Sequence, residues 1–141
     1  MLVSEILRIK GGTLFTTSPE GTVLEAVHVM AEHDVGSLVV MDRGRMVGLL
    51  TFAEVLQALS QRQGDLGDLK VGALQATHPL TAGVDLDVME LRRIMLERHA
   101  RYVPVFDGSM LLGVVSFHDV AKAVYEEQSF ENRMLKDYIE R

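Results

Sequence analysis

The stretch Leu111-Leu112-Gly113-Val114-Val115-Ser116-Phe117-His118-Asp119 decides the fold of this chain of 141 residues. It reads as a short apolar strand, followed by a turn and the start of a helix. Gly113 lies inside the strand, where a missing side chain lets another group approach the backbone closely. Ser116 stands where a helix N-cap is expected, and a helix N-terminus suits a phosphate because it offers unpaired N–H groups and partial positive charge. Asp119 can accept hydrogen bonds from hydroxyl groups.

The same pattern occurs earlier in the chain, as Met46-Val47-Gly48-Leu49-Leu50-Thr51-Phe52-Ala53-Glu54. The two glycines are 113 − 48 = 65 residues apart, and the residues around them keep this spacing without a gap. Short β-type segments at residues 13–16 and 79–81 precede a helix in each copy, so each copy reads β-α-β-β-α. A copy of about 60 residues is marginal alone. We therefore expect an α+β fold in which the two copies pack together with internal pseudo-two-fold symmetry and two related clefts.

The repeat predicts one domain over residues 1–141, with four parts. Repeat one covers residues 3–62, a polar linker covers 63–69, repeat two covers 70–125, and an unrepeated amphipathic helix covers 126–141. The apolar residues of that helix recur at helical spacing, and two roles are open for them: docking on the domain itself or on a second subunit. They are Phe130, Met134, Leu135, Tyr138 and Ile139.

The composition limits the classes of partner. The net charge is −6 at pH 7, and an acidic chain repels a polyphosphate backbone, so we expect no nucleic-acid partner. No run of about 18 apolar residues is present, so we expect no membrane span. The first residues lack the basic and apolar regions of a signal peptide. The chain has no cysteine, which excludes disulfides and thiolate catalysis and fits a cytoplasmic location.

The doubled motif Gly-apolar-x-Ser/Thr-x-x-Asp resembles the cystathionine-β-synthase (CBS) domain pair, in its small stand-alone bacterial form. The resemblance covers nearly the whole chain and rests on residues 18–23, 36–42, 101–107 and 113–119, taken in order. It implies a regulatory module that binds adenine nucleotides in the clefts between the repeats. It also implies that the module signals through its conformation or assembly, and that it commonly forms homodimers.

The resemblance implies a better site in the second copy. Asp119 is expected to bind the ribose hydroxyls, with Ser116 and His118 near the phosphate. Arg101 is expected to offset phosphate charge, because a guanidinium matches two phosphate oxygens at once. The base is expected to lie between two segments, with Tyr102, Val103 and Pro104 on one side and Thr77, His78, Pro79 and Leu80 opposite.

The first copy departs from the pattern, because Glu54 stands where the motif has Asp. Glu is one methylene longer than Asp, so it cannot place its oxygens in the same way without moving the ligand. The resemblance therefore implies a weaker site here. Its candidate residues are Thr13, Leu14, Phe15, Gly36, Ser37, Thr51 and Glu54.

Both acids have a structural interpretation as well. Thr51-x-x-Glu54 fits a capping box, in which Thr caps a helix and Glu binds the backbone N–H of the cap residue. Ser116-x-x-Asp119 fits the same device, although Asp suits it less well. The two glycines have a structural interpretation too, since each one relieves crowding in its strand.

No catalytic arrangement is apparent in the chain. It lacks a Ser/His/Asp order, a Walker loop and a Gly-x-Gly-x-x-Gly motif, and its five histidines lack metal-ligand spacing. We expect no enzyme activity, no metal and no required cofactor. The expected ligand is an adenine nucleotide, AMP first, with ADP, ATP or NAD(H) as alternatives. The second hypothesis is a ligand-independent dimerisation or scaffold module. A regulatory module also implies a regulated protein as a partner, which the sequence does not identify.

Overall fold

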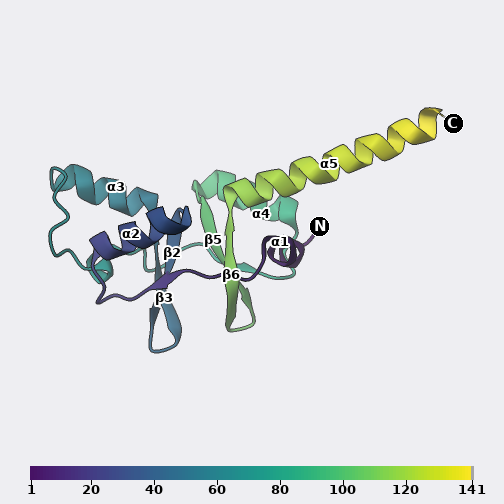
Figure 1. Ribbon diagram of the computed structural model, residues 1–141. Helices are drawn as coiled ribbons and strands as arrows, with labels where there is room; N and C mark the ends of the chain where they lie inside the picture. Colours follow the sequence, from purple (N-terminus) through teal and green to yellow (C-terminus); the bar gives the residue numbers. More distant parts are fainter. Residues whose placement is uncertain (141) are drawn as a thin grey trace. The chain divides into compact units, whose positions relative to one another are not determined.

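The computed structural model describes residues 1–140, within which the chain forms five α-helices, one 3₁₀ helix and six strands (Figure 1). The mixed α+β class predicted from the sequence is confirmed. In chain order the elements are α1 (Val3–Lys10), β1 (Thr16–Thr17), α2 (Val23–His33), β2 (Ser37–Asp42), β3 (Arg45–Thr51), α3 (Phe52–Gln61), η1 (Val71–Ala73), β4 (Ala82–Gly83), α4 (Val88–Arg98), β5 (Tyr102–Asp107), β6 (Met110–Ser116) and α5 (Phe117–Glu140).

The contacts divide the chain into two compact units that do not coincide with the two sequence copies. The Glu54 unit comprises Thr13–Leu80, and the Asp119 unit comprises Met1–Gly12 together with the chain from Thr81 onwards. Helix α1 therefore belongs with the strands of the second copy. The segment that carries η1 belongs with the strands of the first copy.

The Glu54 unit contains a sheet of order β1-β2-β3, in which β1 pairs with β2 in parallel and β2 pairs with β3 antiparallel. Helix α2 is buried at Val23, Ala26 and Met30, which form an apolar stripe because they share one face of a 3.6-residue period. They join buried residues of β2, β3, α3 and η1 in one core. The linker closes over this core, since the Val23 amide donates to the Leu69 carbonyl at 2.8 Å.

The Asp119 unit repeats this plan with a sheet of order β4-β5-β6. The antiparallel pair has a bulge between Val105 and Phe106, 105 − 40 = 65 residues after the bulge between Val40 and Met41 in the other sheet. Helix α1 is tied to this unit at its start, where the Val3 amide donates to the Leu86 carbonyl at 2.9 Å. The buried core includes Val3, Val88, Leu91, Met95, Val103, Val105, Val115 and Val120.

One detail of the predicted elements was wrong. The first strand of each copy lies later than the β-type segments at 13–16 and 79–81, because only Thr16–Thr17 and Ala82–Gly83 pair along a neighbouring strand. The predicted C-terminal helix is confirmed, and it forms the second half of α5, which contains no Gly or Pro that would end it. The last residue of the predicted range, residue 141, lies outside the described residues. No helix within residues 1–140 has the length and apolar character that a membrane crossing requires.

Candidate functional site

The second-copy motif forms one local arrangement in the Asp119 unit. Residues 102–104 of β5 pair with residues 114–116 of β6 in antiparallel register, so that Tyr102 lies opposite Ser116. The Phe117 amide, which opens α5, donates to the Arg101 carbonyl at 2.7 Å. The beginning of β5, the end of β6 and the first turn of α5 therefore meet at one place.

The burial of these residues differs from one to the next. Val103 and Pro104 are buried, Ser116 and Asp119 are half-buried, and Arg101 and His118 are exposed. The hydroxyl of Tyr102 is half-buried as well, and burial raises its pKa while the charge of Arg101 opposes that rise. The structure thus brings together the second-copy candidates from residues 101 to 119. The other candidates, Thr77, His78, Pro79 and Leu80, belong to the Glu54 unit, and their part in a site stays a prediction.

Ser116 and Asp119 form a capping box at the start of α5. The Asp119 amide donates to Ser116 Oγ at 3.0 Å, and the Ser116 amide donates to Asp119 Oδ2 at 2.9 Å. The two hydrogen bonds are those of a capping box, so the structural interpretation of Ser116 and Asp119 is correct for these bonds. It does not exhaust the chemistry of the pair, because a hydroxyl that accepts one bond still has a proton to donate and a carboxylate has about four acceptor positions.

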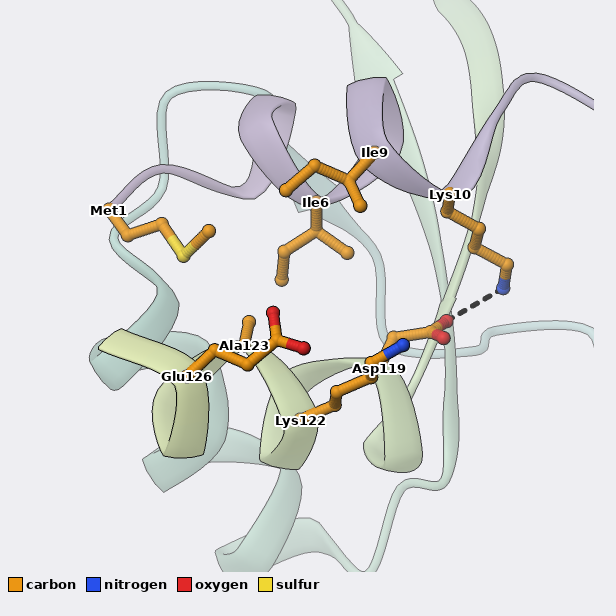
Figure 2. A pocket seen from close by; sticks show the side chains of 8 residues that line it. All are labelled: Met1, Ile6, Ile9, Lys10, Asp119, Lys122, Ala123 and Glu126. Carbon is orange, nitrogen blue, oxygen red and sulfur yellow. Dashed lines mark hydrogen bonds and ion pairs between the residues drawn. The ribbon is translucent and has the colours of Figure 1, made fainter. Parts of the chain in front are cut away.

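A cation that the sequence did not reveal binds the same carboxylate. The ammonium of Lys10, the last residue of α1, lies 2.7 Å from Asp119 Oδ2 and 2.9 Å from the carbonyl oxygen of Val114 (Figure 2). Burial by itself raises the pKa of Asp119. The bonds from Lys10 and Ser116 outweigh that effect and hold the pKa of Asp119 below its usual value. Asp119 is therefore an ionised, half-buried acceptor at neutral pH.

A pocket of about 200 Å³ opens beside this ion pair. Figure 2 shows Met1, Ile6, Ile9 and Lys10 facing it from the α1 segment, and four residues of α5 facing it from the other side. Ile6, Ile9 and Ala123 give it apolar walls, and its charges come from two lysines and two acids. The residues from α5 are Asp119, Lys122, Ala123 and Glu126.

The two motif glycines make room for neighbouring side chains. A Cβ on Gly113 would lie 3.1 Å from Leu7 Cδ2 of α1, and a Cβ on Gly48 would collide with Gln75. Close approach was the predicted role of the glycines. The group that approaches Gly113 is the Leu7 side chain of α1, and the groups that approach Gly48 are the Gln75 side chain and the Ala76 backbone oxygen of the segment after η1.

Glu54 differs from Asp119 in how its oxygens are bound. Thr51 donates from its amide to Glu54 Oε1 at 3.0 Å and from its hydroxyl to Glu54 Oε2 at 2.9 Å. The Thr51 hydroxyl in turn accepts from the Ala53 amide at 3.2 Å. The predicted capping box is confirmed, and it engages both oxygens of the acid.

The other first-copy candidates all lie in the Glu54 unit. Buried Ser37 pairs with Thr51 across the sheet, and the Gly36 carbonyl accepts from the Phe52 amide at 3.2 Å. Phe15 stacks on His33, with ring centroids 4.2 Å apart. Of the two remaining candidates, Leu14 is half-buried and Thr13 is exposed. Residues 1–140 contain no group of three His, Asp or Glu side chains placed to hold a metal ion.

A family model of the CBS domain matches residues 3–61 and again residues 71–126. The chain belongs to the CBS-domain family. This CBS pair is 27% identical over 147 residues to CBSX3, a mitochondrial CBS domain-containing protein of Arabidopsis thaliana, across 98% of this chain and 71% of that protein. It is also similar to the crystal structure of the CBS-domain containing protein ATU1752 from Agrobacterium tumefaciens. That match has a TM-score of 0.82 and 27% identity, over 87% of this chain and 98% of that one.

A third match adds a ligand-bound relative of the fold. The CBS domain pair of protein MJ0100, in complex with 5′-methylthioadenosine and S-adenosyl-L-methionine, matches with a TM-score of 0.79 over 90% of this chain and 98% of that chain. Its identity of 22% makes this a likeness of fold. CBS pairs are generally regulatory ligand-binding modules, and stand-alone pairs are typically non-catalytic.

Proposed function

We propose that this CBS pair senses an adenine nucleotide, AMP first, with ADP, ATP or NAD(H) as alternatives, and that it signals by conformation or assembly without chemistry of its own. The observation that carries the proposal is the position of Asp119. It is an ionised, half-buried carboxylate at the start of a long helix, next to the Ser116 hydroxyl and the first residues of β5. An ionised carboxylate accepts charge-assisted hydrogen bonds, the stronger kind, from the two hydroxyls of a ribose.

The surroundings of Asp119 support a nucleotide in particular. The N-terminus of α5 favours a negative charge, and the exposed side chains of Arg101 and His118 are close in sequence to the motif and reach solvent. Both ligands in the MJ0100 complex contain an adenosine group and no phosphate, so they support the adenosine part of this proposal. In this proposal Tyr102, Val103 and Pro104 border the base, as the family resemblance implies.

We propose that the first copy binds the ligand more weakly than the second copy or does not bind it. Both oxygens of Glu54 accept bonds from Thr51, so a ribose would have to replace bonds that hold the start of α3. The corresponding bonds of Asp119 engage Oδ2. We therefore assign ligand binding to the second copy.

The test compares two matched substitutions of the motif acids. Isothermal titration with AMP, ATP and NAD(H) is expected to detect binding to the wild-type protein, a loss of at least about tenfold in Asp119→Asn, and little change in Glu54→Gln. A ligand at 100 times its dissociation constant adds about 2.7 kcal/mol, so thermal unfolding detects it as well. The proposal is wrong if no adenosine ligand binds, or if Glu54→Gln weakens binding as much as Asp119→Asn does.

A second candidate function is assembly, and the exposed half of α5 favours it. Five large apolar side chains beyond the buried part of α5 are 56 to 77% exposed, and Figure 1 shows this half of the helix extending beyond the strands of its own unit. Docking on the domain is therefore not observed for residues 1–140. The exposed residues are Phe130, Met134, Leu135, Tyr138 and Ile139.

We propose a second copy of this chain as the partner of that helix face. Three acids, at 126, 127 and 131, precede a segment that carries the cations Arg133 and Lys136 and the acids Asp137 and Glu140. An antiparallel pair of α5 helices brings the acidic segment of one copy opposite the segment of the other copy that holds both cations. Met134→Glu is expected to convert a dimer to a monomer in analytical ultracentrifugation. Asn132→Glu is the control, because it adds the same charge about 200° around the helix. Equal effects of the two substitutions, or a monomeric wild-type protein, would exclude this interface.

A further inference from the structure

Lys10 makes an internal contact at the proposed ribose-binding carboxylate. Its ammonium donates to Asp119 Oδ2 at 2.7 Å and to the Val114 carbonyl at 2.9 Å. The contact joins residues 109 positions apart in sequence, within one compact unit. Asp119 Oδ2 also accepts the Ser116 amide, so this oxygen already has two donors.

An ammonium and a ribose diol compete for the same kind of acceptor. Both present short, strong donors to a carboxylate, and Asp119 has a limited number of acceptor positions. The side chain of Lys10 is 40% exposed, against 18% for Asp119. Lys10 can therefore turn into solvent without losing its hydration, while Asp119 stays fixed by the capping box. The pocket beside the pair carries a second acid, Glu126, on its wall.

The Glu54 unit has no equivalent cation. Leu7 and Gln75 occupy equivalent places on Gly113 and Gly48, and three residues further along each segment stand Lys10 and His78. The ring Nδ1 of His78 lies 3.1 Å from Thr77 Oγ1. Within residues 1–140 Glu54 takes part in no ion pair, so this arrangement is particular to the Asp119 site.

We propose that Lys10 is a positioning residue that regulates the ligand site, because its ammonium occupies the hydroxyl-binding side of Asp119 until a ribose diol displaces it. This inference rests on the proposed function. A ribose diol that binds Asp119 through both carboxylate oxygens places one hydroxyl on Oδ2, which already accepts the Ser116 amide and the Lys10 ammonium, so the diol must break the Lys10 bond. A ligand without a diol need not break it. Removing the ammonium is therefore expected to strengthen binding of the diol specifically, by about two- to fivefold, the range found for partly exposed ion pairs.

The experiment compares AMP with 2′,3′-dideoxy-AMP, which has the same base and phosphate but no diol. Dissociation constants of both are measured by titration calorimetry for the wild-type protein and for Lys10→Met, Lys10→Arg and Arg8→Met. The readout is the ratio of the two dissociation constants within each protein, in which effects on the phosphate cancel. Arg8→Met is the matched control, since Arg8 is an exposed cation of the same helix whose side chain makes no hydrogen bond or ion pair within the described residues.

The expected result is a dideoxy-AMP to AMP ratio that rises two- to fivefold in Lys10→Met and stays at the wild-type value in Lys10→Arg and Arg8→Met. An unchanged or lower ratio in Lys10→Met overturns the inference while AMP binding still supports the proposed function. A rise in Arg8→Met as well overturns it too, because the effect is then one of general charge. If AMP binds neither the wild-type protein nor Lys10→Met, this inference fails, and the proposed function fails with it only if ADP, ATP and NAD(H) do not bind either. Thermal unfolding shows that each variant is folded before titration.

Discussion

The ion pair between Lys10 and Asp119 is expected to stabilise the Asp119 unit at neutral pH and to lose this effect in acid. Lys10→Met removes the cation and keeps a side chain of similar length. The carboxylate that remains is half-buried and still accepts the Ser116 amide at 2.9 Å, so it is not left buried without a partner. The loss is therefore expected near that of a partly exposed pair, about 1 kcal/mol, and not the roughly 3–5 kcal/mol of a broken buried pair.

The sign of the pH dependence follows from the lowered pKa of Asp119. The native pKa lies below the ordinary value of 3.8, so the stabilisation is complete well above that value and is lost as the pH falls through the native pKa. At pH 7 we expect Lys10→Met to unfold about 2–5 °C below the wild-type protein. Below the native pKa of Asp119 the two melting temperatures are expected to converge.

The assay is thermal unfolding followed by circular dichroism, between pH 7 and pH 2.5, with Arg8→Met as the control for loss of a cation from α1. Arg8→Met is expected to show a small difference from the wild type that does not converge in the same pH range. A Lys10→Met protein as stable as the wild type at pH 7, or a difference that is independent of pH, would refute this account of the ion pair.

Two further predictions concern the segments that pack on the motif glycines. Gly48→Ala is expected to cost about 1–3 kcal/mol of unfolding free energy by overpacking, because the added methyl meets the Ala76 backbone oxygen at 2.8 Å. Gly113→Ala is expected to cost less, because it meets only the end of the Leu7 side chain. Gln75→Leu is expected to stabilise the protein by about 1 kcal/mol, since Gln75 Oε1 is buried without a hydrogen-bond partner within residues 1–140. Chemical denaturation of the four proteins checks both predictions, and equal costs for the two glycines or a destabilised Gln75→Leu would contradict them.

Most of what could be predicted about the fold comes from sequence patterns of short range, such as the spacing of apolar residues. The stripes of α2 and α4 follow from 3.6-residue spacing, and their buried residues, such as Met30 and Met95, are those that the spacing selects. The 65-residue offset of the sequence repeat also separates the two bulges, so the two antiparallel pairs have equivalent register. The family then follows from the motifs, because each motif occurs twice and in order.

Contacts between distant segments account for what could not be predicted. Nothing in residues 3–10 indicates that α1 packs with the second copy, so the sequence did not associate Lys10 with Asp119. Pairing with β2 and with β5, and not the β-type composition, determines where β1 and β4 begin. The site residues on the 77–80 segment depend on tertiary placement in the same way, and their roles remain predictions.

One methylene group is the chemical difference between the acids of the two motifs, and it bears on which copy binds. Both copies place a hydroxyl residue and an acid three positions apart at the start of a helix, and both form the capping box. The longer Glu54 folds back so that one oxygen binds the amide of Thr51 and the other binds its hydroxyl. The shorter Asp119 binds the Ser116 amide through Oδ2 and uses the same oxygen for Lys10. Hydrogen bonds from Thr51 occupy both oxygens of Glu54, whereas one of the two partners of Asp119 Oδ2 is the part-exposed ammonium of Lys10, so a ligand can exchange for a partner of Asp119 at lower cost. Exchanging the acids alone, in Glu54→Asp and Asp119→Glu, is therefore expected to weaken the second site without creating a first one, because Lys10 and its pocket stay with the second.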